Sequence, residues 1–210
     1  MENSDSIKTV LNKNTYKIKE KGSQFLGFVF PIKSVEDANE ELLNIKKEFY
    51  DATHHCYAYK LNIGEEKYSD DGEPNGTAGL RIYNAINHFE LNNVLVVVVR
   101  YFGGTKLGVG PLGKAYYNCA FEVLDSSKKV ELTKFEKIEI KYNYEDVSKI
   151  HYLINKFKCE QILDIFDNYP KITCFIQPIK IANFEEELTN NLYGKAELKV
   201  VQKTIYLNLK

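Results

Sequence analysis

The chain lacks a long hydrophobic run. Its most apolar stretch, residues 94–99, has the length of a buried strand, whereas a membrane-spanning helix needs about 20 residues. The first 15 residues are polar and lack the apolar segment of a secretory signal. The 4 cysteines are scattered without CxxC spacing, which favours a reducing compartment over a disulfide framework. These absences predict a cytoplasmic protein that makes no membrane contact.

Arginine is almost missing as well. Arg81 and Arg100 are the only two arginines, and both lie in the central part of the chain, which contains most of the glycines. An arginine in a lysine-rich chain indicates a need for planar, forked hydrogen-bond donors. The net charge is −1 and neither half has a marked excess of lysine, so the chain does not have the dense positive footprint of a typical nucleic-acid-binding module. Any contact with a polyanion must therefore be local.

The residues that are present are sufficient for packed cores. Of the 210 residues, 44% are hydrophobic and 27% are charged, as in ordinary globular domains. This length suits one large domain or two small ones. We predict two α+β domains, residues 1–133 and residues 134–210.

Hydrophobic periodicity predicts the elements of the first domain. The expected strands are residues 15–19, 25–32, 54–62 and 94–99, and the last of these is expected to be covered on both faces. One helix follows Ser34, which forms a capping pair with Asp37, and another covers residues 80–89. Residues 68–79 are predicted to form a loop. A third helix begins at Pro111, a residue that suits the first helical position.

The second domain is predicted to have a βαββαβ order. The expected strands are residues 135–142, 159–166, 171–181 and 196–207, and residues 168–170 form a turn. The expected helices are residues 147–157 and 183–192, the latter capped by Asn183 with Glu186. This order is the ferredoxin-like plan, which hosts many functions, RNA-binding platforms among them.

Residues 100–114 form a glycine-rich segment that joins a buried strand to a helix. In such a connection the backbone amides and the helix dipole face a bound anion, and glycine lets a ligand approach the backbone closely. Tight packing of the strand against the helix would also explain the glycines. The candidate anion-binding or nucleic-acid-binding residues are Arg100, Tyr101, Gly103, Gly104, Lys106, Gly108 and Lys114.

Residues 108–115 match the phosphate-binding loop formula GxxxxGK up to its last position. Ala115 stands where a hydroxyl would bind Mg²⁺, and Pro111 removes one amide donor. We interpret the match as coincidental, and no cofactor or metal ion is expected.

A second cluster of polar residues precedes the glycine-rich segment. A metal site or a Cys–His nucleophilic pair can be drawn from it, but a strand cannot close residues i and i+2 around one ion, and Asp-Asp-Gly-Glu-Pro suits a turn. A hydrogen-bonded strand with an ordered loop is the simpler interpretation. The candidate residues are His54, Cys56, Asp70, Asp71, Glu73 and Thr77.

Three stretches together resemble the YigZ/IMPACT family. They are His-His-Cys-Tyr-Ala at residues 54–58, Ser-Asp-Asp-Gly-Glu-Pro-Asn-Gly-Thr-Ala-Gly at residues 69–79, and Val-Val-Val-Arg-Tyr-Phe-Gly-Gly-Thr-Lys-Leu-Gly at residues 97–108. The resemblance implies an N-terminal βαβ domain like a domain of a small-subunit ribosomal protein and like domain IV of elongation factor G. It further implies a C-terminal ferredoxin-like domain. The chain departs from the family pattern at Leu80-Arg81, Pro111 and Gly113.

The resemblance implies a role in the control of translation, because eukaryotic relatives block activation of a starvation-responsive kinase. We therefore expect a non-catalytic binding protein whose partner is RNA, the ribosome or a translation factor. Two alternatives remain open at this point. One is an enzyme that acts on a small phosphorylated or peptidyl substrate through His54, Cys56 and Asp70 or Asp71, and the other is a pure protein-interaction module.

Overall fold

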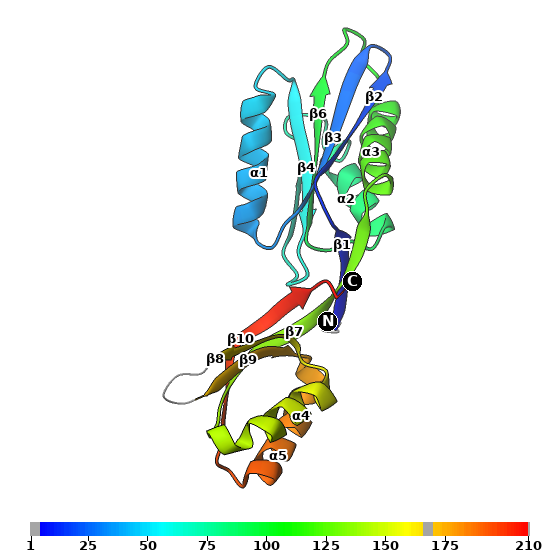
Figure 1. Cartoon of the computed structure of the whole chain (residues 1–210). Helices are drawn as coiled ribbons and strands as arrows, with labels where there is room; N and C mark the ends of the chain where they lie inside the picture. The colour runs from blue at the N-terminus through cyan, green and yellow to red at the C-terminus, as the bar shows by residue number, and fades with distance from the viewer. Residues whose placement is uncertain (1–4, 166–169, 210) are drawn as a thin grey trace. The chain divides into compact units, whose positions relative to one another are not determined.

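The computed structural model describes residues 5–165 and 170–209, which divide into two compact units (Figure 1). The first unit comprises residues 7–131, and the second is formed mainly by residues 132–210. Both units combine strands with α-helices, so the chain is a mixed α/β protein. None of the helices in the described part of the chain is long and apolar enough to cross a membrane.

The first unit is built on a five-stranded antiparallel sheet with the strand order β2-β3-β6-β4-β5. Helix α1 covers one face of this sheet, and helices α2 and α3 cover the other (Figure 1). In chain order the elements are β2 (Asn14–Glu20), β3 (Ser23–Pro31), α1 (Val35–Glu48), β4 (His54–Lys60), β5 (Glu66–Ser69), α2 (Gly79–His88), β6 (Val94–Tyr101) and α3 (Val109–Asp125).

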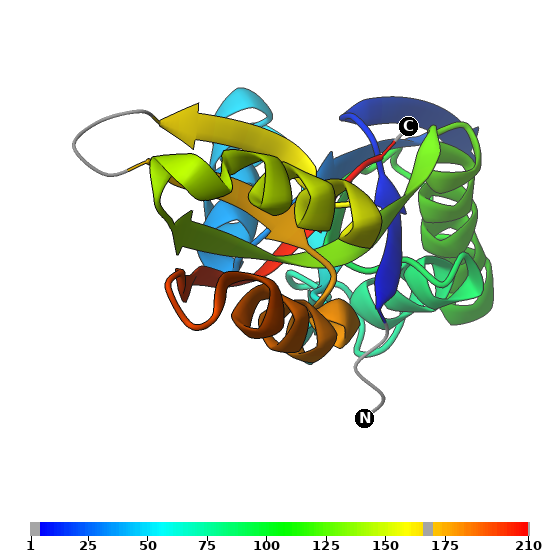
Figure 2. The ribbon, with the colours of Figure 1, turned by 60° about the horizontal axis from the view of Figure 1, so that its bottom comes forward.

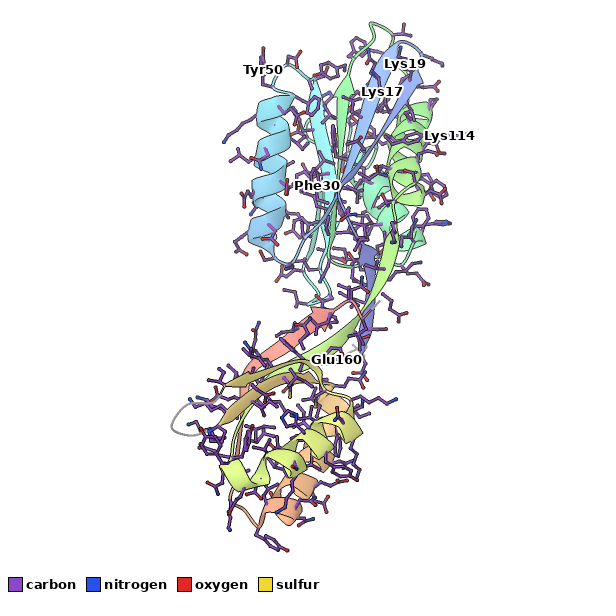
Figure 3. All side chains as sticks on the ribbon, in the orientation of Figure 1. Lys17, Lys19, Phe30, Tyr50, Lys114 and Glu160 are labelled. Carbon is purple, nitrogen blue, oxygen red and sulfur yellow. The ribbon has the colours of Figure 1, made fainter. Side chains whose placement is uncertain are left out.

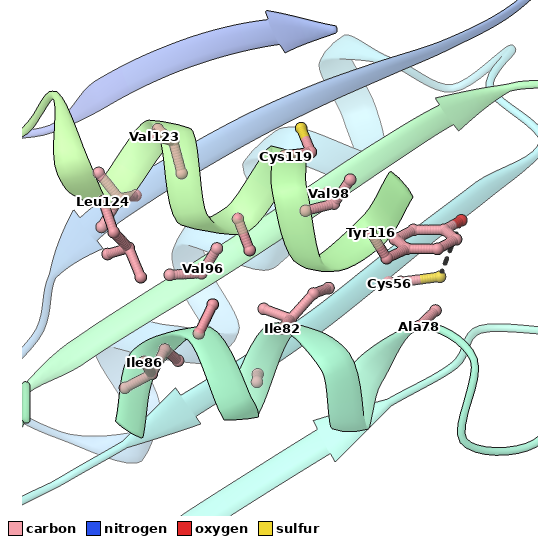
Figure 4. Close-up of a cluster of buried hydrophobic side chains, with 14 of the residues drawn as sticks. Cys56, Ala78, Ile82, Ile86, Val96, Val98, Tyr116, Cys119, Val123 and Leu124 are labelled. Atoms are coloured by element: carbon pink, nitrogen blue, oxygen red, sulfur yellow. Dashed lines mark hydrogen bonds between the residues drawn. The ribbon is translucent and has the colours of Figure 1, made fainter. Parts of the chain in front are cut away.

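Strand β6 is the central strand and is buried on both faces. Because successive side chains of a strand point to opposite faces, Val96 and Val98 join the core under α2 and α3, whereas Leu95 and Val97 join the core under α1. This confirms the prediction that the unbroken apolar run is covered on both sides. Figure 4 shows the first of these cores, in which Tyr116 and Val123 of α3 share one buried cluster with Ile82 of α2.

The start of α1 is fixed by its own sequence. The Ser34 hydroxyl accepts a hydrogen bond from the Asp37 amide at 3.1 Å, and the Asp37 carboxylate accepts one from the Lys33 amide at 2.8 Å. Side chains therefore pair with two amides near the helix start, one of which would otherwise have no partner within the helix. The predicted capping pair is confirmed.

The second unit has an antiparallel sheet with the strand order β10-β7-β9-β8. Helices α4 and α5 lie next to each other on one face of this sheet (Figure 2). The element order is βαββαβ, as predicted. The elements are β7 (Lys129–Lys141), α4 (Val147–Phe157), β8 (Glu160–Ile165), β9 (Lys171–Ile176), α5 (Ile181–Leu192) and β10 (Glu197–Leu207).

Several element boundaries differ from the prediction. Strand β9 ends at Ile176, because Pro178 has no amide for the ladder and begins a short 3₁₀ turn. Helix α5 starts at Ile181 with no side-chain cap, so the predicted pair of Asn183 and Glu186 is wrong. Helix α3 begins two residues before Pro111.

Two short strands had no predicted counterpart. One predicted turn lies mostly outside the described residues. Strand β1 (Ser6–Val10) pairs with β7, and β5 takes the first two residues of a stretch predicted to be loop. Residues 166–169, which include most of the predicted 168–170 turn, lie outside the described residues.

Candidate functional site

The segment of residues 102–108, here called the glycine loop, connects β6 to α3 at one end of the first sheet (Figure 1). It is anchored at its start, where the Phe102 amide donates to Thr53 Oγ1 at 3.1 Å and the Gly103 amide donates to Ser23 Oγ at 3.2 Å. The exposed amides of residues 104–106 have no hydrogen-bond partner among the residues described. These amides are therefore open to an acceptor from outside the chain.

The glycine loop crosses the turn between β2 and β3 at very short range. A Cβ atom added to Gly103 would lie 1.9 Å from the carbonyl carbon and 2.2 Å from the oxygen of Gly22, and 2.3 Å from the Ser23 nitrogen. No L side chain fits in that space. Gly103, which the sequence assigned to anion binding, thus has a structural reason to be glycine.

The first turn of α3 follows the glycine loop and has no side-chain cap. Its N-cap residue, Gly108, has a φ of +83°, a conformation that favours glycine. Lys114 lies on the exposed side of this helix and faces away from the sheet (Figure 3). Arg81 from α2 lies beside Gly113, where an added Cβ would be 3.2 Å from its Nε. Two positive charges therefore lie at the second turn of a helix whose first amides lack intrahelical partners.

Arg100 has a different place from the one the sequence suggested. It is buried, and its guanidinium forms an ion pair with Glu73 at 2.6 Å. It also donates to Ser23 Oγ at 3.3 Å and lies over the rings of Phe25 and Phe102. Its two terminal nitrogens thus donate to groups inside the domain, while its Nε atom is buried without a hydrogen-bond partner among the described residues, so the guanidinium is not available to an external phosphate.

Glu73 is the centre of a buried network that joins all three family motifs. Its Oε1 atom accepts hydrogen bonds from Arg100 at 2.6 Å and from the Tyr116 hydroxyl at 2.8 Å. The Nε2 atom of His54 lies 3.8 Å from the same oxygen. Cys56 Sγ donates to the Tyr116 oxygen at 3.4 Å, as the dashed line in Figure 4 marks. Segments far apart in the sequence are therefore held together by one carboxylate.

The chemistry of Cys56 does not suit a nucleophile. Its thiol is fully buried, and it also donates to the Asp70 carbonyl at 3.0 Å. Burial raises the pKa of the Cys56 thiol far above its usual range, with Glu73 and the two aspartates adding to the effect. The neutral thiol, which is a poor nucleophile, is thus the form present at neutral pH.

Asp70 organises the loop between β5 and α2. Its carboxylate accepts hydrogen bonds from the amides of Gly76, Ala78 and Gly79, each at 2.9 Å. This arrangement occupies both of its oxygens and caps the start of α2. Thr77, another predicted residue, is buried and donates through its hydroxyl to the Pro74 carbonyl at 2.6 Å. Both residues therefore hold the loop in its conformation.

Asp71 ties the same loop to β4 and α1. Its carboxylate accepts from the His55 amide at 2.7 Å and pairs with Lys46 at 3.3 Å, while the Asp71 carbonyl contacts Nδ1 of His54 at 2.7 Å. Burial alone would raise the pKa of Asp71, but the hydrogen bond from His55 and the charge of Lys46 outweigh it and hold the pKa below its ordinary 3.8.

The lowered pKa of Asp71 predicts an acid-sensitive contribution to stability. The ionised carboxylate stabilises the fold above its unfolded-state pKa of 3.8, and that contribution is lost as pH falls through the lower folded-state pKa. Urea unfolding should show wild type more stable than Asp71→Asn at neutral pH, with a gap that shrinks below about pH 4. Glu40→Gln, at an exposed position of α1, is the matched control and should show no such trend. A gap that stays constant with pH would contradict the prediction.

Tyr101 lies on the side of the glycine loop that faces α1. Its hydroxyl donates to Asp51 at 2.7 Å, and this hydrogen bond raises the pKa of Tyr101.

Among the described residues, no group of three or more histidine, cysteine, aspartate or glutamate side chains is arranged to hold a metal ion.

Sequence reasoning missed the residues that complete the network. Tyr116 has the helical spacing of its apolar neighbours in α3, and this pattern indicates only a core position. Ser23, which accepts hydrogen bonds from both Arg100 and Gly103, carried no pattern. The one available signal was the presence of a glycine on each side of the crossing, Gly22 and Gly103. Gly22 by itself indicates only a connection between two strands.

Comparison with known proteins places these motifs in context. The Impact N-terminal domain family model matches residues 21–124. An IMPACT family member from Haemophilus influenzae is 32% identical over 192 residues, which cover 87% of this chain and 90% of that protein. The IMPACT family member YvyE of Bacillus subtilis is 30% identical over 196 residues, which cover 91% of this chain and 89% of that protein.

A solved structure has the same fold over nearly the whole chain. The structure, described as that of a hypothetical protein, has a TM-score of 0.70 and 25% sequence identity. The matched region covers 95% of this chain and 98% of the chain in that structure. The similarity therefore includes both units and not only the part with the motifs.

Proposed function

The chain belongs to the IMPACT family, and on that premise we propose that it is a non-catalytic protein that binds RNA, alone or within the ribosome, and thereby regulates translation. The observation that carries the proposal is the row of exposed, unpaired amides at residues 104–106, which leads into an uncapped helix start. Backbone amides and a helix dipole of this kind favour phosphate.

The charges around these amides support the same proposal. Lys106 and Lys114 are exposed, and Arg81 reaches α3 from the neighbouring helix at Gly113, one turn after the helix start. We therefore assign to Arg81 the role of the phosphate-binding arginine, which the sequence analysis had assigned to Arg100. Phosphate contacts of this local kind need no strongly basic domain, which agrees with the net charge of −1.

Gly110 provides a second support. A Cβ atom added there would meet nothing within 4 Å, and its φ is not in the left-handed region. Folding therefore gives no reason for glycine in the first turn of α3, where alanine would favour the helix. Close approach of a ligand to the backbone is a reason that lies outside the fold.

The rival function, an enzyme that uses His54, Cys56 and Asp70 or Asp71, has less support. These groups do gather around one loop, but the Asp70 carboxylate is taken up by three amides and the Cys56 thiol is buried and neutral. Among the described residues of this cluster, no hydrogen bond joins a nucleophile to a free base.

We also propose the finer fold assignment that the resemblance implied. Residues 1–133 would form an IMPACT-type domain like domain IV of elongation factor G, and residues 134–210 a ferredoxin-like domain. The order β10-β7-β9-β8 with both helices on one face supports the second assignment.

Co-sedimentation with ribosomes over a series of salt concentrations tests the proposed function. We expect association at about 50 mM salt that weakens steeply as salt rises, because phosphate contacts release counterions. In the double variant Lys106→Ala/Lys114→Ala, the slope of log K against log salt should be shallower by about 0.7 to 0.9 per lost contact.

The matched control is Lys33→Ala/Lys47→Ala, which removes the same charge from exposed positions in the same unit. It should bind ribosomes as wild type does. Absence of binding at low salt, or equal binding by both double variants, would rule the proposal out. Association that survives nuclease treatment would indicate a protein partner such as a translation factor.

A further inference from the structure

Three planar groups lie in contact where β6 meets the glycine loop. The Cζ atom of Arg100 lies 5.4 Å from the ring centroid of Phe25 and 5.5 Å from that of Phe102. Phe25 is completely buried and Arg100 is 5% exposed, whereas Phe102 is 46% exposed. The stacked groups thus run from the core of the domain to its surface and end in an aromatic ring that contacts solvent.

The backbone that carries the exposed ring is held in place, and the ring lies against a fixed guanidinium. The Phe102 amide is bonded to Thr53, and the next residue is fixed by the crossing with Gly22. The guanidinium on one side of the ring is itself fixed by Glu73 and Ser23. A ligand that stacks on Phe102 would therefore not have to immobilise it, so little of the stacking free energy would be lost to ordering.

The surroundings of this ring favour an anionic, planar ligand. The unpaired amides of residues 104–106 and the exposed Lys106 come directly after it, and the exposed Lys21 lies in the turn that packs against Gly103. Aromatic rings that alternate with phosphate contacts are the usual means of binding single-stranded nucleic acid. In a duplex the faces of the bases are hidden within the stack.

We propose that the glycine loop binds single-stranded RNA, with one unpaired base stacked on Phe102 and the adjacent phosphate on the amides of residues 104–106. This inference rests on the proposed function and makes it specific: the loop selects unpaired RNA over duplex RNA. The ring supplies the preference for single strands, and the amides with Lys106 supply the attraction to phosphate.

Fluorescence anisotropy on the full chain tests this with three probes: a short oligoadenylate, the same strand annealed to oligouridylate, and inorganic polyphosphate. Wild type should bind the single strand more tightly than the duplex. Phe102→Leu should weaken single-strand binding by roughly fivefold to a hundredfold, the loss expected for one base–aromatic stack, and leave polyphosphate binding unchanged. Phe102→Tyr, which keeps the ring, should restore it.

Tyr152→Leu, which removes an exposed aromatic ring from α4, is the matched control and should bind as wild type does. Equal affinity of wild type for single strand and duplex would overturn the inference. Unchanged single-strand binding by Phe102→Leu would also overturn the inference. In either case, if Lys106→Ala/Lys114→Ala loses binding to the single strand and to the duplex, the proposed function still stands. Absence of binding to all three probes would overturn the inference, and the proposed function would be overturned with it only if ribosome co-sedimentation at low salt were absent as well.

Discussion

Gly103→Ala should lower the free energy of unfolding by at least about 3 kcal/mol, so that the first unit unfolds in mild denaturant. The added Cβ atom would lie 1.9 Å from the carbonyl carbon of Gly22, and the obstacle is backbone that cannot rotate away. Relief of this overlap requires the loop and the β2–β3 turn to separate, which would break the bond from the Gly103 amide to Ser23. Urea denaturation followed by circular dichroism measures the change.

The control for this substitution is Gly110→Ala in the same segment. An added Cβ meets nothing within 4 Å at that position, so stability should be unchanged or slightly higher. If both alanine variants unfold at the same urea concentration, the glycine crossing does not have the structural importance described above. The two variants also separate fold from binding, because Gly110→Ala should stay folded and bind RNA more weakly.

Removal of the Glu73 carboxylate should produce the second large effect. The side chains of Glu73 and Arg100 are only 5% and 6% exposed, so Glu73→Leu would leave a buried cation without its partner. Loss of one partner from a buried pair typically costs about 3–5 kcal/mol. Chemical denaturation should therefore show a loss of that order.

The double variant Glu73→Leu/Arg100→Met is the informative companion, because it removes both charges. We expect it to recover part of the lost stability, since two apolar side chains can replace a buried ion pair at little cost. Glu41→Ala, which breaks the exposed pair with Lys13, should cost about 0–1 kcal/mol. A Glu73→Leu variant no less stable than Glu41→Ala would contradict the prediction.

The parts of the fold that were predictable from sequence are those with local causes. The apolar run of β6 indicates a strand covered on both faces, and Ser34 with Asp37 marks the start of α1. Both signals depend on residues a few positions apart. Strand β5 was missed because it is short and polar, so its pairing with β4 is a property of the sheet and not of its own pattern.

The arrangement of the site depends on contacts between distant residues. Arg100 and Glu73 are 27 positions apart, and no local pattern indicates that the guanidinium meets a carboxylate and not an external phosphate. The glycines pose the same problem. Gly103 and Gly110 look alike in the sequence, yet one lies against another backbone and the other has empty space around it. That distinction exists only in three dimensions.

The crossing of Gly103 over Gly22 also links the motions of two segments that are 81 positions apart. Because no gap separates the two backbones, the glycine loop cannot be displaced towards β3 without carrying the β2–β3 hairpin with it. Strand β2 lies at the edge of the sheet and is paired on one side only. Asn14 at the start of β2 donates to Ser126 and Ser127 at the end of α3, so a displacement at the loop would be carried through the lysine-bearing outer strand to the far end of that helix.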